Sequence, residues 1–138
     1  TLPVMMGFYS FVAGGILERH PHLKVAFMEI GAQWVPYLVQ RFDHYHHADG
    51  ALGMPLPIKQ PSSETLKQSD VYFTPEADEL FLPQVVKYLG EDRLLFEGDM
   101  PHAEAREGAK QELLERDDLS EEIKWKILST NGRRFLNL

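Results

Sequence analysis

The sequence predicts an α/β fold built on a parallel sheet, because short strand-like runs alternate with segments of helical spacing. Residues 24–30 and 94–96 are mostly apolar rather than alternating, which is typical of parallel strands covered on both faces. Residues 71–74 are rich in β-branched and aromatic side chains. Strands that are separated by helices connect through right-handed crossovers. We therefore expect about three βα units around one sheet.

The N-terminal half is expected to place one helix on each side of the first strand. Residues 4–17 form a broad apolar helical face, although a Gly-Gly pair weakens its last turns. This stretch is shorter than the roughly 20 residues that a membrane-spanning helix needs, so we interpret it as a buried helix. Residues 34–45 also follow helical spacing, and Pro36 is tolerated in the first turn.

The C-terminal half is expected to begin with a long loop over residues 50–70, which is rich in Gly and Pro and has room for one short helical turn at residues 62–67. A helix then opens at Pro75 with an acidic first turn and runs to residue 89, interrupted at Pro83. A polar helix follows the third strand over residues 103–116. Ser120 has the side chain and the position of an N-cap for the last helix.

Composition limits the classes of partner and cofactor. The 138 residues carry a net charge of -7 and no long run of basic residues, which argues against nucleic acid. Because the chain has no cysteine, a metal would be held by His, Asp or Glu, and a reducing, cytoplasmic location is expected. The first residue is Thr rather than Met, and an apolar segment follows it directly. We therefore expect the chain to begin within a longer protein.

Asp99 is the most informative single residue. It ends the run Leu-Leu-Phe-Glu-Gly-Asp-Met-Pro-His, in which an apolar strand stops at a carboxylate that proline and histidine follow. A carboxylate at the C-terminal end of a buried parallel strand lies where such a sheet opens to a ligand. A solvated acidic loop is the alternative.

Several segments along nearly the whole chain form a further pattern. They are Leu23–Gly31, Trp34–Tyr37, Val71–Thr74, Gly90–Phe96, Asp99–His102, Leu119–Glu122, Lys126–Leu128 and Asn131–Phe135. Taken together, these segments resemble the amidohydrolase-related family, and they correspond to the sixth, seventh and eighth strands of that family's metal-dependent (β/α)₈ barrel. Because such barrels take about 250 residues, the resemblance implies that residues 1–138 form a single partial domain, the C-terminal portion of a TIM barrel.

The resemblance implies a role for three residues. Asp99 matches the aspartate after the eighth strand, which binds the metal and handles the proton of water or substrate. Glu29 stands where many relatives carry a catalytic histidine. It could either orient the substrate or form a structural hydrogen bond to a loop. His102 matches a histidine that could contact substrate, with a bond to its own loop as the alternative. The implied cofactor is a divalent ion, zinc by expectation. Because Asp99 alone matches the family's metal ligands, the isolated chain is expected neither to hold the metal tightly nor to be active.

Glu97 departs from the family pattern, in which a small residue is common two places before the aspartate. Residues two apart on a strand share a face, so Glu97 and Asp99 could point into the same interior. Two such carboxylates repel unless a metal or a basic side chain lies between them. A twist that exposes Glu97 is the simpler interpretation.

The histidines at 44, 46 and 47 fall at the end of a predicted helix. The first and third share a helix face and could form a surface metal pair. We interpret the cluster as a solvated helix end, where cationic histidine suits the helix dipole. Trp34 and Trp125 are expected in the core.

The implied function is metal-dependent hydrolysis of an amide, ester or lactone by an activated water. A non-oxidative decarboxylase of the same fold is the alternative within the family. A non-catalytic assembly module and an independent α/β domain are alternatives from other classes. The expected partners are a small-molecule substrate and a second copy or a separate N-terminal half, because a three-stranded sheet leaves unpaired edges.

Overall fold

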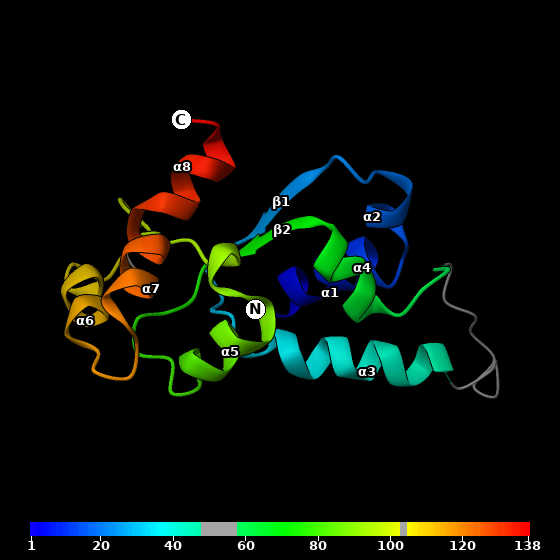
Figure 1. Ribbon diagram of the computed structural model, residues 1–138, viewed down its shortest axis with the longest axis horizontal. Helices are drawn as coiled ribbons and strands as arrows, with labels where there is room; N and C mark the ends of the chain where they lie inside the picture. The colour runs from blue at the N-terminus through cyan, green and yellow to red at the C-terminus, as the bar shows by residue number, and fades with distance from the viewer. Residues whose placement is uncertain (48–57, 103–104) are drawn as a thin grey trace.

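The described residues contain a two-stranded parallel sheet, and in Figure 1 the helices lie below it and beside its ends. The computed structural model describes residues 1–47, 58–102 and 105–138. Strand β1 (Lys24–Phe27) pairs with β2 (Asp70–Phe73) in parallel, in a register that sets Phe27 opposite Phe73. Much of the loop predicted for residues 50–70 lies outside the described residues; its described end contains α4 (Ser62–Gln68).

The predicted third strand is reduced to a single bridge. Leu94 forms an isolated parallel bridge with Phe73, and Leu95 N donates to Phe73 O at 2.8 Å. One residue later, Phe96 N donates to Ile127 O at 2.9 Å. Because the backbone of Phe96 is bonded to the C-terminal helices, the chain leaves the sheet before a full strand can form.

The first predicted helix is broken in two. Helix α1 (Leu2–Val12) ends before the two glycines, and α2 (Ile16–Arg19) begins after them. Gly15 adopts a φ of 74°, a left-handed conformation that turns the chain. Only one side of α1 is buried, through Phe8 and Val12.

The central helices cover the sheet beside α1. Helix α3 (Val35–His47) follows the first strand as predicted, and α5 (Leu82–Leu89) packs against it. The expectation that this second helix starts at Pro75 is wrong, because it begins at Leu82 with Pro83 in its first turn, where proline is tolerated.

The C-terminal helices follow residues 94–96, the predicted third strand, in the chain. A short 3₁₀ turn, η1 (Glu91–Arg93), directly precedes Leu94. Helix α6 (Ala109–Glu115) is shorter than predicted, and residues 103 and 104 of the predicted helix lie outside the described residues. Ser120 caps α7 (Glu121–Trp125) as predicted, since its Oγ accepts from Ile123 N. A π-helical turn, η2 (Lys126–Thr130), leads into α8 (Asn131–Leu136).

Aromatic rings fill the core between α1 and the sheet. Phe8 has zero exposure and makes edge contacts with Phe27, Trp34 and Phe73, with ring centroids 5.2 to 5.7 Å apart. Trp34 is partly buried and packs against this core, in agreement with the expectation. The expectation is wrong for Trp125, which is 57% exposed on α7. The ring cluster ties α1 to the carboxyl ends of both strands.

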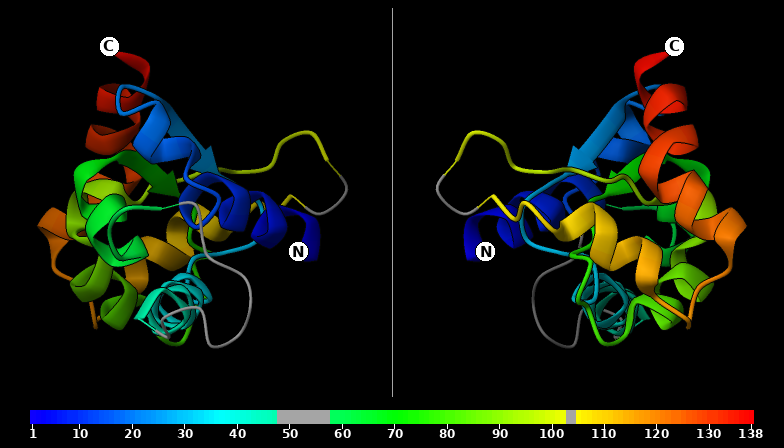
Figure 2. Two further views of the ribbon diagram at one scale, coloured as in Figure 1. Left: turned by 90° about the vertical axis from the view of Figure 1, so that its right-hand side faces the viewer. Right: turned by 90° about the vertical axis from the view of Figure 1, so that its left-hand side faces the viewer.

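No helix among the described residues is both long and apolar enough to cross a membrane. The segment after Phe96 runs outward beside the N-terminal end of α1 (Figure 2). The carboxyl ends of the strands therefore face this segment.

Candidate metal centre

Glu29 and Asp99 follow the strand positions at the same end of the sheet. Glu29 comes two residues after β1, and Asp99 comes five residues after the Leu94 bridge. Both have left-handed backbone conformations, with φ of 67° and 50°. Such values are uncommon outside glycine and recur at functional sites, where the surrounding structure holds them in place.

The side chains of Glu29, Asp99 and His102 converge. One potential ligand atom from each lies within 4.8 Å of the others. Asp99 Oδ1 is 2.6 Å from Nδ1 of His102, and Glu29 Oε1 is 3.9 Å from the same nitrogen. The side chain of Asp99 is only 20% exposed, against 56% for Glu29 and 65% for His102. Asp99 is therefore the best-sheltered of the three groups.

This donor set suits a divalent cation. Two carboxylates and one imidazole offer oxygen and nitrogen ligands without a thiolate, as manganese and zinc sites in proteins do. His102 is also bound to its own loop, since its backbone N donates to Asp99 O at 2.9 Å. The structure thus brings together the three residues that sequence reasoning selected.

Glu97 is half-buried and not exposed by a strand twist, so that interpretation is wrong. Its Oε1 accepts a hydrogen bond from Glu29 N at 2.6 Å and another from the hydroxyl of Thr74. Both bonds are accepted by the same carboxylate oxygen, and no ion pair joins Glu97 to a basic side chain among the described residues. Glu97 and Asp99 do line one cavity of about 290 Å³, together with Glu29.

The same cavity is strongly acidic. Glu76 and Arg106 also line it, so four carboxylates face one guanidinium. Burial raises the pKa of Glu76, and Arg106 opposes that shift. Arg106 is bonded to Asp78 at 2.7 Å, and this hydrogen bond lowers the pKa of the Asp78 carboxyl. The excess of carboxylates favours a cation in the cavity.

The comparison with known proteins decides the family. The family model described as amidohydrolase matches residues 2–138. The chain belongs to the amidohydrolase family. An amidohydrolase from Mycobacterium avium subsp. paratuberculosis K-10 is 25% identical, with a TM-score of 0.77 over 94% of this chain and 32% of that one.

Two further relatives are decarboxylases. The 5-carboxyvanillate decarboxylase of Novosphingobium aromaticivorans DSM 12444, solved with manganese and 4-hydroxy-3-methoxy-5-nitrobenzoic acid, is 25% identical, with a TM-score of 0.75. The match covers 96% of this chain and 38% of that one. The 2,6-dihydroxybenzoate decarboxylase of Rhizobium shares the fold at 24% identity, with a TM-score of 0.67 over 91% and 38% of the two chains.

The amidohydrolase match explains the small sheet. The chain spans about a third to two fifths of the solved relatives' length, from 32% to 42%. It corresponds to the C-terminal portion of the amidohydrolase barrel, which confirms the fold class predicted from the resemblance. In this barrel portion, the carboxyl ends of the strands carry Glu29 and Asp99.

Glu79 fixes the loop of the amidohydrolase portion that follows Glu29. It is 5% exposed, and its Oε1 accepts from Ala32 N at 2.7 Å and Gln33 N at 3.0 Å. Its Oε2 is buried and has no hydrogen-bond partner among the described residues. Sequence reasoning placed this residue only in an acidic helix turn, and no local pattern identifies its acceptor role. Burial raises its pKa above the ordinary value, and the two backbone donors oppose the shift.

Replacing Glu79 by glutamine should change how stability depends on pH. The pKa of Glu79 is raised in the folded state, so the protonated side chain favours the folded protein. This contribution to the free energy of unfolding is complete below the pKa of the unfolded state, near 4.5, and it is lost as the pH rises through the pKa of the folded state. The loss is about 1.4 kcal/mol for each unit by which the pKa is raised. Urea unfolding at pH 4.5, 6 and 7.5 should therefore show the wild type losing stability relative to Glu79→Gln as pH rises.

An exposed glutamate provides the control for this measurement. Glu107→Gln removes the same charge from the surface, and its stability relative to wild type should stay constant over that pH range. Parallel pH profiles for Glu79→Gln and wild type would show that the Glu79 carboxyl does not titrate differently on folding.

The histidine cluster does not join the acidic site of the amidohydrolase portion. His44 is exposed at the end of α3, and its ring contacts Tyr45 at 5.7 Å. Among the side chains that the structure describes, neither His44 nor His46 belongs to a group of three potential metal ligands. The side chain of His47 lies outside the described residues. The pattern agrees with the predicted solvated helix end.

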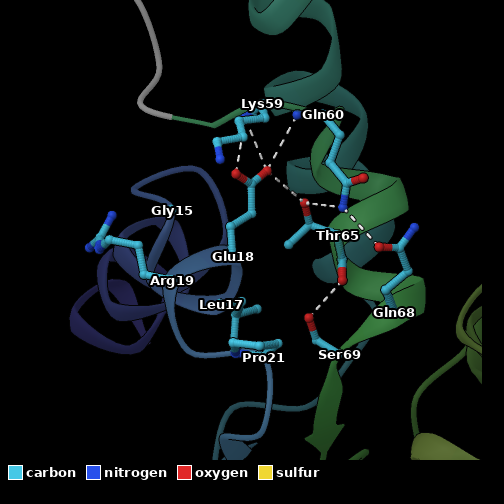
Figure 3. A pocket seen from close by; sticks show the side chains of 10 residues that line it. All are labelled: Gly15, Leu17, Glu18, Arg19, Pro21, Lys59, Gln60, Thr65, Gln68 and Ser69. Atoms are coloured by element: carbon cyan, nitrogen blue, oxygen red, sulfur yellow. Dashed lines mark hydrogen bonds between the residues drawn. The ribbon is translucent and has the colours of Figure 1, made fainter.

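A second cavity lies at the opposite ends of the strands (Figure 3). It measures about 520 Å³, and the carboxylate of Glu18 lies at its centre. Glu18 accepts from Lys59 N at 3.0 Å, Gln60 N at 3.3 Å and Thr65 Oγ1 at 3.3 Å. These bonds join α2 to α4 and to the segment before it. We interpret Glu18 as structural, since its carboxylate is satisfied by the protein.

Proposed function

We propose that this chain supplies the C-terminal edge of a divalent-metal site in an enzyme that decarboxylates a small aromatic or unsaturated acid. The observation that carries the proposal is the convergence of Glu29, Asp99 and His102 within 4.8 Å at the carboxyl ends of the strands. Active sites of (β/α)₈ barrels lie at this face. The remaining metal ligands would come from the strands that this stretch does not contain.

The three residues have separate proposed roles. Asp99 would hold the metal and move a proton, because its carboxylate is the most sheltered and is bonded to His102 through Oδ1. Glu29 would be the second acidic group of the site. His102 would contact the substrate while Asp99 orients its ring through Nδ1. When bound, a divalent ion would neutralise a substrate carboxylate that these acidic groups would otherwise repel.

Support for decarboxylation comes from the relatives. The structures that resemble this chain include 5-carboxyvanillate and 2,6-dihydroxybenzoate decarboxylases. In the proposed reaction the bond between ring carbon and carboxylate breaks, carbon dioxide leaves, and a proton is delivered to that carbon. Asp99 and His102 share a hydrogen bond at which such a proton can be held.

Hydrolysis of an amide, ester or lactone is the second candidate. It is supported by the amidohydrolase family itself and by the mycobacterial relative. In that reaction the Asp99 carboxylate would accept the proton of the attacking water, so the same residue serves both reactions. Product analysis separates the two.

Manganese is the metal that we propose, in place of zinc as expected from the resemblance. A manganese-bound relative supports it, and so does the donor set of two carboxylates and one imidazole. Zinc is the alternative, and metal analysis of the protein purified without added metal would discriminate between them.

The decisive experiment is product analysis on the natively purified protein. With added Mn²⁺, carboxyl-labelled hydroxybenzoates should release labelled carbon dioxide, and chelation should stop the release. Native mass spectrometry of the same sample would give the assembly and the metal content. Hydrolysis of esters or lactones without release of carbon dioxide would favour the second candidate. A metal-free assembly with neither activity would support a non-catalytic module.

A further inference from the structure

The backbone of Glu29 is held by two side chains that belong to other strand ends. Its N–H donates to Glu97 Oε1 at 2.6 Å and to Thr74 Oγ1 at 3.1 Å. Glu29 has a φ of 67°, which is unfavourable for a residue with a β-carbon. A conformation of this kind persists where the surrounding structure over-determines it. The two acceptors provide that constraint.

Thr74 is well placed to orient Glu97. It is 1% exposed, and its own N donates to Phe27 O at 3.2 Å, which continues the ladder between the strands. Its hydroxyl donates to Glu97 Oε1 while it accepts from Glu29. The three groups therefore form a closed set of hydrogen bonds, and Thr74 anchors that set to the sheet.

We propose that Glu97 and Thr74 are positioning residues, a clamp that holds Glu29 in the conformation in which its carboxylate meets Asp99 and His102. The inference rests on the proposed metal site. Residues that orient a metal ligand from behind influence affinity without touching the metal. The clamp would also explain why this chain has glutamate at a position where the family commonly has a small residue.

The rival explanation is charge alone. Glu97 lies in the acidic cavity, so its carboxylate would attract a cation even without the hydrogen bond to Glu29. Two variants separate the explanations. Thr74→Val removes the hydroxyl at nearly constant volume and leaves the charge unchanged. Glu76→Gln removes a carboxylate that lines the same cavity and makes no hydrogen bond to Glu29 among the described residues.

The test is Mn²⁺ binding to the purified protein, measured through the relaxation of water protons. We expect Thr74→Val and Glu97→Met, which removes both hydrogen bonds accepted by Glu97 at similar side-chain size, each to weaken the affinity by about tenfold, as loss of a supporting group does. Glu76→Gln should weaken it by only about twofold, as loss of one partly solvated charge does. Thr74→Ser, which keeps the hydroxyl, should bind as the wild type does.

A second readout reports the clamp without metal. Hydrogen exchange of the Glu29 amide, followed by NMR in the metal-free protein, should become faster in Thr74→Val and in Glu97→Met but not in Glu76→Gln. Thermal unfolding of each variant would establish that it is folded.

Two results would overturn the inference, and they differ. Wild-type affinity in folded Thr74→Val, with equal losses in Glu97→Met and Glu76→Gln, would show that only charge matters while the metal site stands. Absence of saturable Mn²⁺ binding by the natively purified wild-type assembly, which would supply the remaining ligands, would overturn the proposed metal site itself, and the inference with it.

Discussion

Replacing Asp99 by asparagine should weaken Mn²⁺ binding by at least about tenfold, the lower end of the loss seen for groups that merely support a metal ligand. The substitution keeps the shape of the side chain and one oxygen but removes the charge. Asp99 is the most sheltered of the three converging groups, at 20% exposure, so water replaces its interaction less well than that of Glu29. The proposed decarboxylation should fall in parallel.

Electron paramagnetic resonance of free Mn²⁺ would measure the affinity directly. Asp117→Asn is the matched control, because it removes the same charge from an exposed turn before Ser120. We expect that control to bind as the wild type does. Equal affinity of Asp99→Asn and the wild type would contradict the assignment of Asp99 as a ligand. An equal loss in both variants would show that only net charge matters.

Sequence reasoning identified those parts of the fold that depend on local pattern. The continuous apolar run before Glu29 predicts β1, helical spacing after Trp34 predicts α3, and a serine before two glutamates predicts the cap of α7. Asp99 was identified by its place at the end of an apolar run. These features depend on neighbours in the chain, so the sequence displays them.

The features that could not be predicted depend on residues far apart in the chain. Glu97 bonds the backbone of Glu29 across 68 positions, and Glu79 bonds Ala32 across 47. The strand at residues 94–96 is shortened because Phe96 bonds Ile127 in a C-terminal helix. No local spacing reveals such partners. The acceptor role of each carboxylate therefore emerges only from the tertiary structure.

Gly31→Ala should be the most destabilising substitution in the loop that follows Glu29. Gly31 has a φ of 71°, and an added β-carbon would lie 2.2 Å from Glu79 Oε1. Left-handed backbone at alanine costs about 1–2 kcal/mol. Displacing Glu79 also deprives two backbone N–H groups of their acceptor, at about 1–3 kcal/mol for each group left buried without a partner. We expect a loss of about 3 kcal/mol or more in the free energy of unfolding, measured with urea.

Two other glycines separate the contributions of backbone strain and steric contact. Gly90 has a φ of 90° with open space around it, so Gly90→Ala should show strain alone, of about 1–3 kcal/mol. Gly108 has an ordinary φ of -88° and no atom near an added β-carbon, so Gly108→Ala should be neutral or slightly stabilising. A Gly31→Ala loss no larger than that of Gly90→Ala would mean that Glu79 moves aside without losing its bonds. A larger loss would mean that the buried carboxylate and the glycine form one unit, which sets the loop directly behind Glu29 and therefore the geometry of the proposed metal site.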